Sequence, residues 1–206
     1  MSKEISVEKL QAGDVPYLRG DYLELIEKDF AQVPGIGEQQ AFHMTWDNER
    51  NSRLNMTESI KNPERADFWL AWEEDTALAA AKIGVEHYGD RPDLPPAGYE
   101  MARLLHKSGI VRPSNAQIFA LGLEPSLPDD RQQEIFNSVV ATAADTLDDN
   151  IRKLAAFVDT RDERLFDLME GYRKQVGGSL KIGRKVVEIS QGGVVRDYRR
   201  FSVNLR

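Results

Sequence analysis

From Gln117 to Tyr172, short apolar stretches alternate with longer amphipathic ones. A short apolar stretch (IFALGLEP) is followed by a long amphipathic one (DDRQQEIFNSVVATAADTL), a second apolar stretch (KLAAFV) and a shorter amphipathic one (RDERLFDLMEGY). A short apolar run predicts a buried strand, whereas a 3.6-residue rhythm predicts a helix. The segment therefore predicts a βαβα unit whose parallel strands are joined by a right-handed crossover.

The first sixty residues carry weaker patterns. Residues 3–10 alternate as a strand does. Asp14 is a candidate helix cap, with Pro16 in the first turn, and the apolar positions that follow at helical spacing are Leu18, Tyr22, Leu25 and Phe30. A second helical region, 42–60, has poor periodicity. We expect a first helix that ends before residues 33–35, and a second helical region that is either broken or mobile.

The segment 66–107 reads as a hairpin followed by irregular chain. Two strand-like runs, 68–72 and 78–85, flank a polar turn and predict a β-hairpin. The turn-rich stretch 87–98 predicts a surface loop. Residues 99–107 fit either a short helix or a strand.

The C-terminal residues predict a last hairpin, with strands 184–190 and 194–205 meeting at Gly192-Gly193. The complete order is β-α-α-β-β-loop-β-α-β-α-β-β. It combines antiparallel hairpins with one parallel crossover, which is typical of an α+β or mixed α/β protein.

Composition indicates one soluble domain covering 1–206, because no linker divides the 206 residues and 41% of them are hydrophobic. The absence of cysteine excludes a disulfide framework and a cysteine nucleophile. Neither a signal-peptide core nor a membrane-length apolar run occurs. We expect a cytoplasmic protein without a membrane partner.

Charge is distributed unevenly along the chain. From Arg173 to the end, nine Lys or Arg face two acidic residues, so this part carries +7 while the rest carries −14. An acidic body disfavours nucleic-acid binding. The basic end either meets an acidic partner or forms the solvent face of antiparallel strands.

The order and lengths of these elements resemble the GNAT acyltransferase superfamily, which transfers acyl groups from coenzyme A to amines. The likeness rests on ALGLEP at 120–125, on the helix from about 128 to 147, and on FVDTRDERLFDLMEGYRK at 157–174 with its Gly171-Tyr172 pair. The resemblance implies a three-layer fold around a twisted, mostly antiparallel sheet with one parallel crossover. It also implies acetyl-CoA or another acyl-CoA as cosubstrate.

In such a fold the central strand leaves backbone groups unpaired, and the pantetheine arm can complete the ladder. The resemblance places this role on Leu121, Gly122, Leu123 and Glu124. The pyrophosphate would reach the following helix start, where Arg131 is the candidate phosphate ligand.

Two features depart from the family pattern. The family's glycine-containing phosphate loop is replaced here by SLPDDRQQE, in which Ser126 and Asp129 can form a capping pair for the helix. Asp167 stands where family members commonly carry the general-acid tyrosine. Tyr172 is a substitute for that acid, although its spacing equally fits a core position.

The acceptor side is assigned through the resemblance. Glu86 is a candidate general base at a strand end, where an ordinary surface carboxylate is the competing interpretation. Tyr22, His43 and Trp46 are candidates for the acceptor pocket. The three histidines form no zinc-binding motif, so we expect no metal.

Two functions stay open at this stage. One is an N-acyltransferase acting on an amine of a small molecule or a protein. The other is a catalytically inactive module of the same fold that binds a ligand or a protein, which the missing glycines favour. Whether the chain forms a homodimer is also open.

Overall fold

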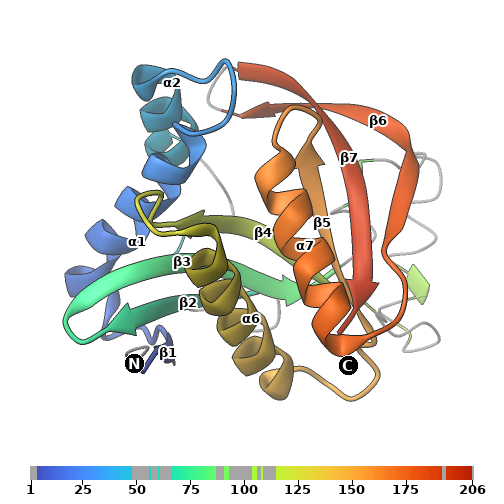
Figure 1. The fold of residues 1–206 in the computed structure, drawn as a ribbon, viewed down its shortest axis with the longest axis horizontal. Helices are drawn as coiled ribbons and strands as arrows, with labels where there is room; N and C mark the ends of the chain where they lie inside the picture. The colour runs from blue at the N-terminus through green and yellow to red at the C-terminus, as the bar shows by residue number, and fades with distance from the viewer. Residues whose placement is uncertain are drawn as a thin grey trace.

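The computed structural model describes residues 4–47, 56, 60, 66–86, 91–92, 104–105, 108, 115–191 and 194–205 (Figure 1). Its strands form one sheet in the order β1-β2-β3-β4-β5-β7-β6. The strands are β1 (Ser6–Lys9), β2 (Ala66–Glu73), β3 (Thr76–Val85), β4 (Asn115–Leu123), β5 (Lys153–Asp159), β6 (Lys181–Gln191) and β7 (Val194–Asn204). The helices are α1 (Val15–Phe30), α2 (Glu38–Phe42), the π-helix η1 (His43–Asp47), α6 (Asp129–Thr146) and α7 (Glu163–Val176).

One strand pair in this sheet is parallel. β4 pairs with β5 in parallel, and the other neighbours pair antiparallel. This confirms the mixed α+β class, and it confirms the βαβα unit, since α6 connects the parallel pair and α7 follows β5. The predicted hairpins are confirmed as β2–β3 and β6–β7. Gly192 and Gly193, which connect β6 to β7, lie outside the described residues.

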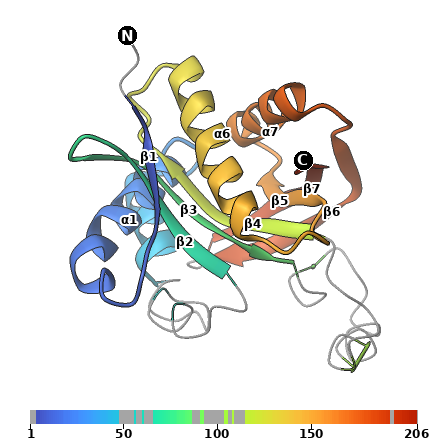
Figure 2. The same cartoon turned by 90° about the horizontal axis from the view of Figure 1, so that it is seen from below.

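The helices cover both faces of the sheet, which makes three layers. Figure 2 shows α6 and α7 on one face and α1 on the other. The core on the α6–α7 face joins Ile135 and Val139 of α6 to Trp69 and Ala81 of the sheet. The core on the α1 face joins residues such as Tyr22 and Ile26 to Phe68 and Leu70. Alternate residues of one strand therefore serve opposite cores, as the pleat requires.

The N-terminal predictions hold for α1 but not for its cap. Asp14 occupies the N-cap position, yet its side chain accepts a hydrogen bond from the Gln11 amide (2.7 Å) rather than from the helix. At the start of the second helical region α2 ends at Phe42 and a π-helix follows. Whether the region is broken beyond Asp47 stays a prediction. Much of 42–60, and most of the loop at 87–98 and of the segment at 99–107, lie outside the described residues.

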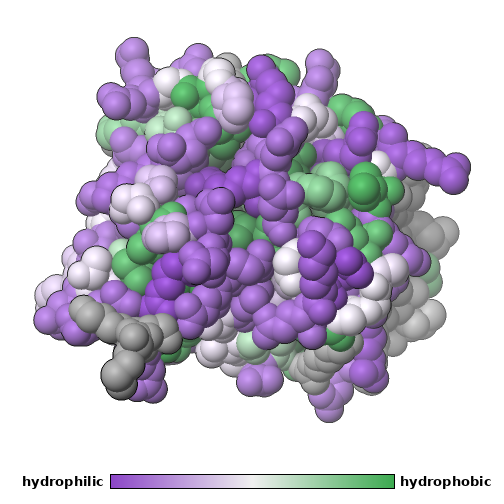
Figure 3. Space-filling model, in the orientation of Figure 1, coloured by the Kyte–Doolittle hydropathy of each residue, from purple (hydrophilic) through white to green (hydrophobic). Residues whose placement is uncertain are grey.

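The surface in the orientation of Figure 1 is mostly hydrophilic (Figure 3). Among the described large hydrophobic side chains, Ile182 and Val186 of β6 are 50% and 41% exposed. Within the described part of the chain, no helix has the length and apolar character needed to cross a membrane.

Candidate functional site

β4 and β5 part halfway along their length. They pair from Asn115–Lys153 to Ile118–Ala156, after which β4 continues to Leu123 and β5 to Asp159 without pairing to each other. A register shift between β3 and β4 leaves Phe119 without a partner at this point. The sheet therefore opens between its two central strands, and main-chain groups of β4 lose their sheet partners there.

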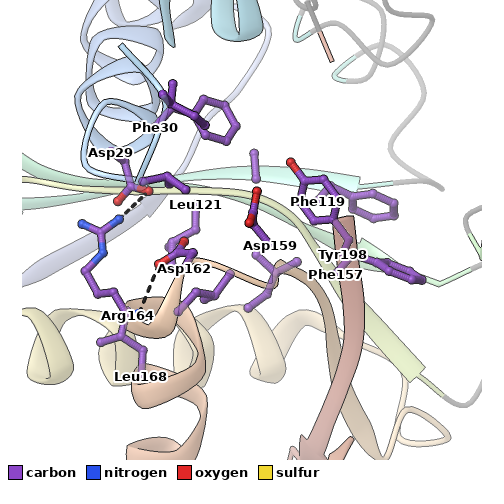
Figure 4. A pocket seen from close by; sticks show the side chains of 15 residues that line it. Asp29, Phe30, Phe119, Leu121, Phe157, Asp159, Asp162, Arg164, Leu168 and Tyr198 are labelled. Atoms are coloured by element: carbon purple, nitrogen blue, oxygen red, sulfur yellow. Dashed lines mark hydrogen bonds and ion pairs between the residues drawn. The ribbon is translucent and has the colours of Figure 1, made fainter. Parts of the chain in front are cut away.

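A cavity of about 80 Å³ fills this opening (Figure 4). Its walls come from both faces of the sheet, since Leu165 and Leu168 belong to α7 whereas Phe30 belongs to the end of α1. The remaining walls are Asp29, Val33, Ile36, Ile118, Phe119, Ala120, Leu121, Phe157, Asp159, Asp162, Arg164 and Tyr198. The cavity thus connects the two sides of the sheet at the point where the strands part.

Asp29 closes one side of the opening. From the last turn of α1, its Oδ1 accepts the Leu123 amide (3.0 Å) and its Oδ2 pairs with Arg164 of α7 (2.8 Å). The residue is buried, and burial raises the pKa of Asp29 to about 6 against the opposing effects of Arg164 and the Leu123 amide. One carboxylate therefore links α1, β4 and α7 across the cavity.

Asp159 and Tyr198 line the opposite side, and they are direct partners in the β5–β7 ladder. Asp159 is paired with Arg196, and both residues are buried. Burial, together with the charge of Asp159, raises the pKa of Tyr198 to about 12. The Tyr198 hydroxyl therefore stays protonated at neutral pH and is a hydrogen-bond donor at the cavity.

The predicted coenzyme-facing residues lie on the edge of the opening. The Glu124 amide donates to Leu78 of β3 (2.9 Å), so by alternation the Leu123 and Leu121 amides face the gap. Asp29 already accepts the first of these. Gly122 instead faces α1, where an added Cβ would lie 2.6 Å from the backbone of Leu25 and Ile26. Whether coenzyme A uses this edge stays a prediction.

Arg131, the predicted phosphate ligand, is held by two carboxylates. Its guanidinium pairs with Glu73 and with Glu134. Asp129 and Asp130 add two more negative charges to the first turn of α6. An anion approaching this helix start would meet excess negative charge, and the role of Arg131 as a phosphate ligand stays a prediction.

The predicted cap of this helix is wrong. Pro128 is the N-cap and no side chain caps the helix. The Ser126 hydroxyl donates to Glu124 Oε1 (2.9 Å) instead. Within the first turn of α6, the Arg131 amide donates to Asp130 Oδ1 (3.0 Å).

Glu86 and Tyr172, the predicted catalytic pair, are not brought together. Glu86 follows β3 and is buried against Arg200, which donates to both carboxylate oxygens (2.9 and 2.7 Å), while Asn115 donates to Oε2 (2.7 Å). Tyr172 is buried in the core on the α6–α7 face, and its hydroxyl donates to the Leu205 carbonyl (2.9 Å). Their catalytic roles stay predictions, and neither lines the cavity.

The predicted acceptor pocket lies on the α1 side of the sheet. Tyr22 is buried, with its ring edge-on to Phe68 at 5.4 Å. Trp46 donates to Glu27 (2.6 Å) and lines a separate hollow of about 430 Å³ beside the start of α1. His43 opens the π-helix, next to Phe42. None of the three lines the cavity between β4 and β5.

Four of the polar and charged residues that line the cavity escaped sequence reasoning, whereas Leu121 is a predicted coenzyme-facing residue. Asp29, Asp159, Arg164 and Tyr198 carry no motif, and each fits an ordinary helix or strand position. A signal was present for Asp159 only, as a polar residue at the carboxyl end of a predicted strand. Among the described residues, no group of three or more His, Asp or Glu is arranged to hold a metal.

Comparison with known proteins identifies the fold. No protein-family model and no curated protein sequence matches the chain. Its structure is similar to a probable acetyltransferase from Staphylococcus epidermidis (TM-score 0.57, 11% identity, covering 98% of this chain and 99% of that one). It is also similar to the PaiA N-acetyltransferase from Thermoplasma acidophilum, solved with coenzyme A (TM-score 0.54, 13% identity, covering 98% of this chain and 99% of that one).

A third similar structure is an acetyltransferase of the GNAT family from Streptococcus pneumoniae (TM-score 0.52, 11% identity, covering 98% of this chain and 99% of that one). Sequence identities this low are evidence for the fold alone. The similarity nevertheless covers nearly all of this chain and nearly all of each compared chain. The fold of this chain is that of the GNAT acyltransferases.

Proposed function

We propose that this protein transfers an acyl group from coenzyme A to an amine. The observation that carries the proposal is the opening between β4 and β5, where a cavity lies between two strands that part inside a continuous sheet. The Leu121 amide faces this gap and can pair with an amide of the pantetheine arm as an added strand would. The similarity to a structure solved with coenzyme A supports this choice of cosubstrate.

The chemistry needs little beyond positioning. The amine nitrogen attacks the thioester carbonyl, a C–N bond forms, and the C–S bond breaks to release the thiol of coenzyme A. The leaving sulfur needs a proton, and Tyr198, which lines the cavity, is the candidate donor. Because burial raises the pKa of Tyr198 to about 12, its hydroxyl gives up the proton only as negative charge develops on the sulfur. The nitrogen loses one proton as the sulfur gains one, so the reaction is balanced overall.

A non-catalytic role for the same fold is the second candidate. The start of α6 favours it, because Arg131 is already paired with Glu73 and Glu134, and Asp129 and Asp130 repel phosphate. If these charges prevent coenzyme binding, the opening would serve another ligand or none.

Thermal shift with acetyl-CoA, CoA and a longer acyl-CoA separates the two candidates. A ligand that binds only the folded protein stabilises it by RT ln(1 + [L]/Kd) and therefore raises Tm. A rise with acetyl-CoA followed by acyl transfer to an amine is the result we expect. Absence of any shift at millimolar CoA would rule out the transferase.

Charge variants sharpen this experiment. We expect Asp129→Asn with Asp130→Asn to bind CoA about tenfold more tightly, since two repelling charges leave the helix start. The control is Asp148→Asn with Asp149→Asn, which removes the same charge beyond the other end of α6. Equal affinity in the two double variants would place the diphosphate away from the α6 start.

A further inference from the structure

The ion pair between Asp29 and Arg164 passes through the opening of the sheet. Asp29 belongs to α1, which packs on one face of the sheet, and Arg164 belongs to α7, which packs on the other (Figure 2). Oδ2 of Asp29 is nevertheless only 2.8 Å from the Arg164 guanidinium. Both residues line the cavity between β4 and β5, and their side chains point toward each other there (Figure 4). The pair therefore occupies space between the two parted strands.

The other oxygen of Asp29 covers the free edge of β4. Oδ1 accepts the Leu123 amide (3.0 Å), and the aspartate is only 7% exposed. Leu123 is fully buried, so without this carboxylate its amide would have no acceptor among the described residues, which costs folding free energy. Asp29 thus does for Leu123 what a neighbouring strand does elsewhere in the sheet.

A pantetheine arm that pairs with β4 as an added strand has to extend past Leu123. Up to Ile118 the edge of β4 is filled by β5, so from Leu121 the arm can continue only toward Leu123. Contacts along a strand edge repeat every second residue, and the Leu121 and Leu123 amides both face the gap. The next contact of such an arm therefore falls on the amide that Asp29 already holds.

We infer that the Asp29–Arg164 pair is a latch across the coenzyme slot, which closes the slot in the free protein and yields the Leu123 amide to a carbonyl of the pantetheine arm. This inference rests on the proposed function. The arm carbonyl is an acceptor, as Oδ1 is, so the buried amide is bonded in both states. The Arg164 side chain is 26% exposed, so the pair can turn toward solvent together and leave neither charge unpaired. Binding is weakened because a neutral carbonyl replaces a charged acceptor.

Isothermal titration with pantetheine, the arm without its phosphates, is the first test. Pantetheine has no charged group at neutral pH, so its affinity does not report repulsion between carboxylates and phosphate. Asp29→Ala empties the slot and frees the Leu123 amide, so we expect a Kd about tenfold lower than that of the wild type. Asp29→Asn keeps a neutral acceptor, so its Kd should be intermediate. An unchanged or higher Kd in Asp29→Ala would overturn the inference.

The matched control is Asp21→Ala, which removes an exposed carboxylate of α1 that does not line the cavity. Its Kd should equal that of the wild type. Where pantetheine alone binds too weakly to titrate, coenzyme A carries the comparison, because Asp29→Ala and Asp21→Ala each lose one negative charge. An equal gain in both variants would show a general charge effect and would count against a latch.

A double variant tests whether the two side chains act as one unit. Arg164→Ala removes the partner that holds Asp29 in the slot, so we expect its Kd to be about threefold lower than that of the wild type. Adding Arg164→Ala to Asp29→Ala should give no further gain, because the latch is already open. Independent gains that multiply would show that the residues act separately, contrary to the inference. Far-ultraviolet circular dichroism verifies folding, and Asp29→Asn and Arg164→Ala decide the question if Asp29→Ala does not fold.

Titration with coenzyme A separates failure of the latch from failure of the proposed function. The tenfold gain of Asp29→Ala should be the same for coenzyme A as for pantetheine, because the start of α6 is unaltered. Equal Kd values for coenzyme A in the wild type and in Asp29→Ala would leave the proposed function standing and remove the latch. Absence of binding of either ligand to both proteins would overturn the proposed function and the inference together.

Discussion

Asp29 is a buried carboxylate whose two oxygens contact different elements. Oδ1 accepts the Leu123 amide of β4 and Oδ2 pairs with Arg164 of α7. These contacts favour the ionised form, yet burial outweighs them and raises the pKa to about 6. The link across the opening is therefore held by a carboxylate that titrates much closer to neutral pH than an exposed aspartate does.

This titration predicts how stability depends on pH. The folded pKa lies above the ordinary value of 3.8, so the folded protein takes up the proton first as pH falls. The contribution of Asp29 to the free energy of unfolding is therefore present at low pH and lost as pH rises through about 6. In Asp29→Asn this dependence is absent. The free energy of unfolding of the wild type minus that of the variant should therefore increase by about 1–2 kcal/mol from pH 7 to pH 5.

Urea unfolding at pH 5, 6 and 7 measures the difference. The control is Glu170→Gln, because the hydrogen bond from Arg173 lowers the pKa of Glu170 below its ordinary value. The difference in free energy of unfolding between the wild type and Glu170→Gln should stay constant from pH 5 to pH 7. A constant difference for Asp29→Asn as well would mean that Asp29 does not titrate there.

At the scale of elements, the position of α1 depends on a glycine in β4. A Cβ on Gly122 would lie 2.6 Å from the Ile26 nitrogen and from the Leu25 carbonyl group. These are backbone atoms, so relief of the clash requires the helix to move. Asp29 lies one turn further along the same helix, so this movement would also disturb its contacts with β4 and α7.

We therefore expect Gly122→Ala to lower the free energy of unfolding by about 1–3 kcal/mol. Gly20→Ala is the matched control, because Gly20 is an exposed interior residue of α1 with no atom within 4 Å of an added Cβ. There alanine should stabilise the helix by about 0.5–1 kcal/mol. Urea midpoints with equal m values give both changes, and a Gly122→Ala protein as stable as wild type would contradict the close approach seen here.

The elements with strong periodicity could be predicted, whereas the junctions could not. α6 and α7 bury one face each, and β3 and β5 are apolar on both faces, so their patterns are unambiguous. The predicted cap by Ser126 failed because a hydroxyl has several acceptors within reach, and Glu124 is the one it contacts.

The cavity could not be predicted, because its polar walls come from segments far apart in the sequence. Asp29 and Arg164 are 135 positions apart, and only tertiary packing places them 2.8 Å from each other. Gln117 belongs to a run that predicts a strand. Its Oε1 atom accepts no hydrogen bond from the described residues, and its strand partners are the small residues Gly84 and Ala155, which the strand register determines.

For the whole molecule, the basic C-terminal end is less available than its charge indicates. Arg173 pairs with Glu170, Arg196 with Asp159, and Arg200 with Glu86. These contacts place three of the nine basic side chains in ion pairs within the protein. The C-terminal strands therefore use part of their charge to hold the centre of the sheet, and a purely electrostatic partner surface loses support.

The two cores also share their strands. In β2, Phe68 and Leu70 face α1 whereas Trp69 and Ala71 face α6, and β3 is divided in the same way. A strand cannot leave one core without leaving the other. We therefore expect the whole chain to unfold in a single transition, as one domain does.

Leu70→Ala tests this coupling. Leu70 is fully buried in the core on the α1 face, so the substitution should cost about 2–5 kcal/mol. Two single-tryptophan proteins report the two sides, one retaining Trp69 in the α6-side core and one retaining Trp46 beside α1. If the cores are coupled, Leu70→Ala lowers the urea midpoint equally for both reporters and for far-ultraviolet circular dichroism. A lower urea midpoint for the Trp46 reporter alone would mean that the α1 layer unfolds separately. In that case the opening between β4 and β5 would lose its α1 wall while the remaining sheet stays folded.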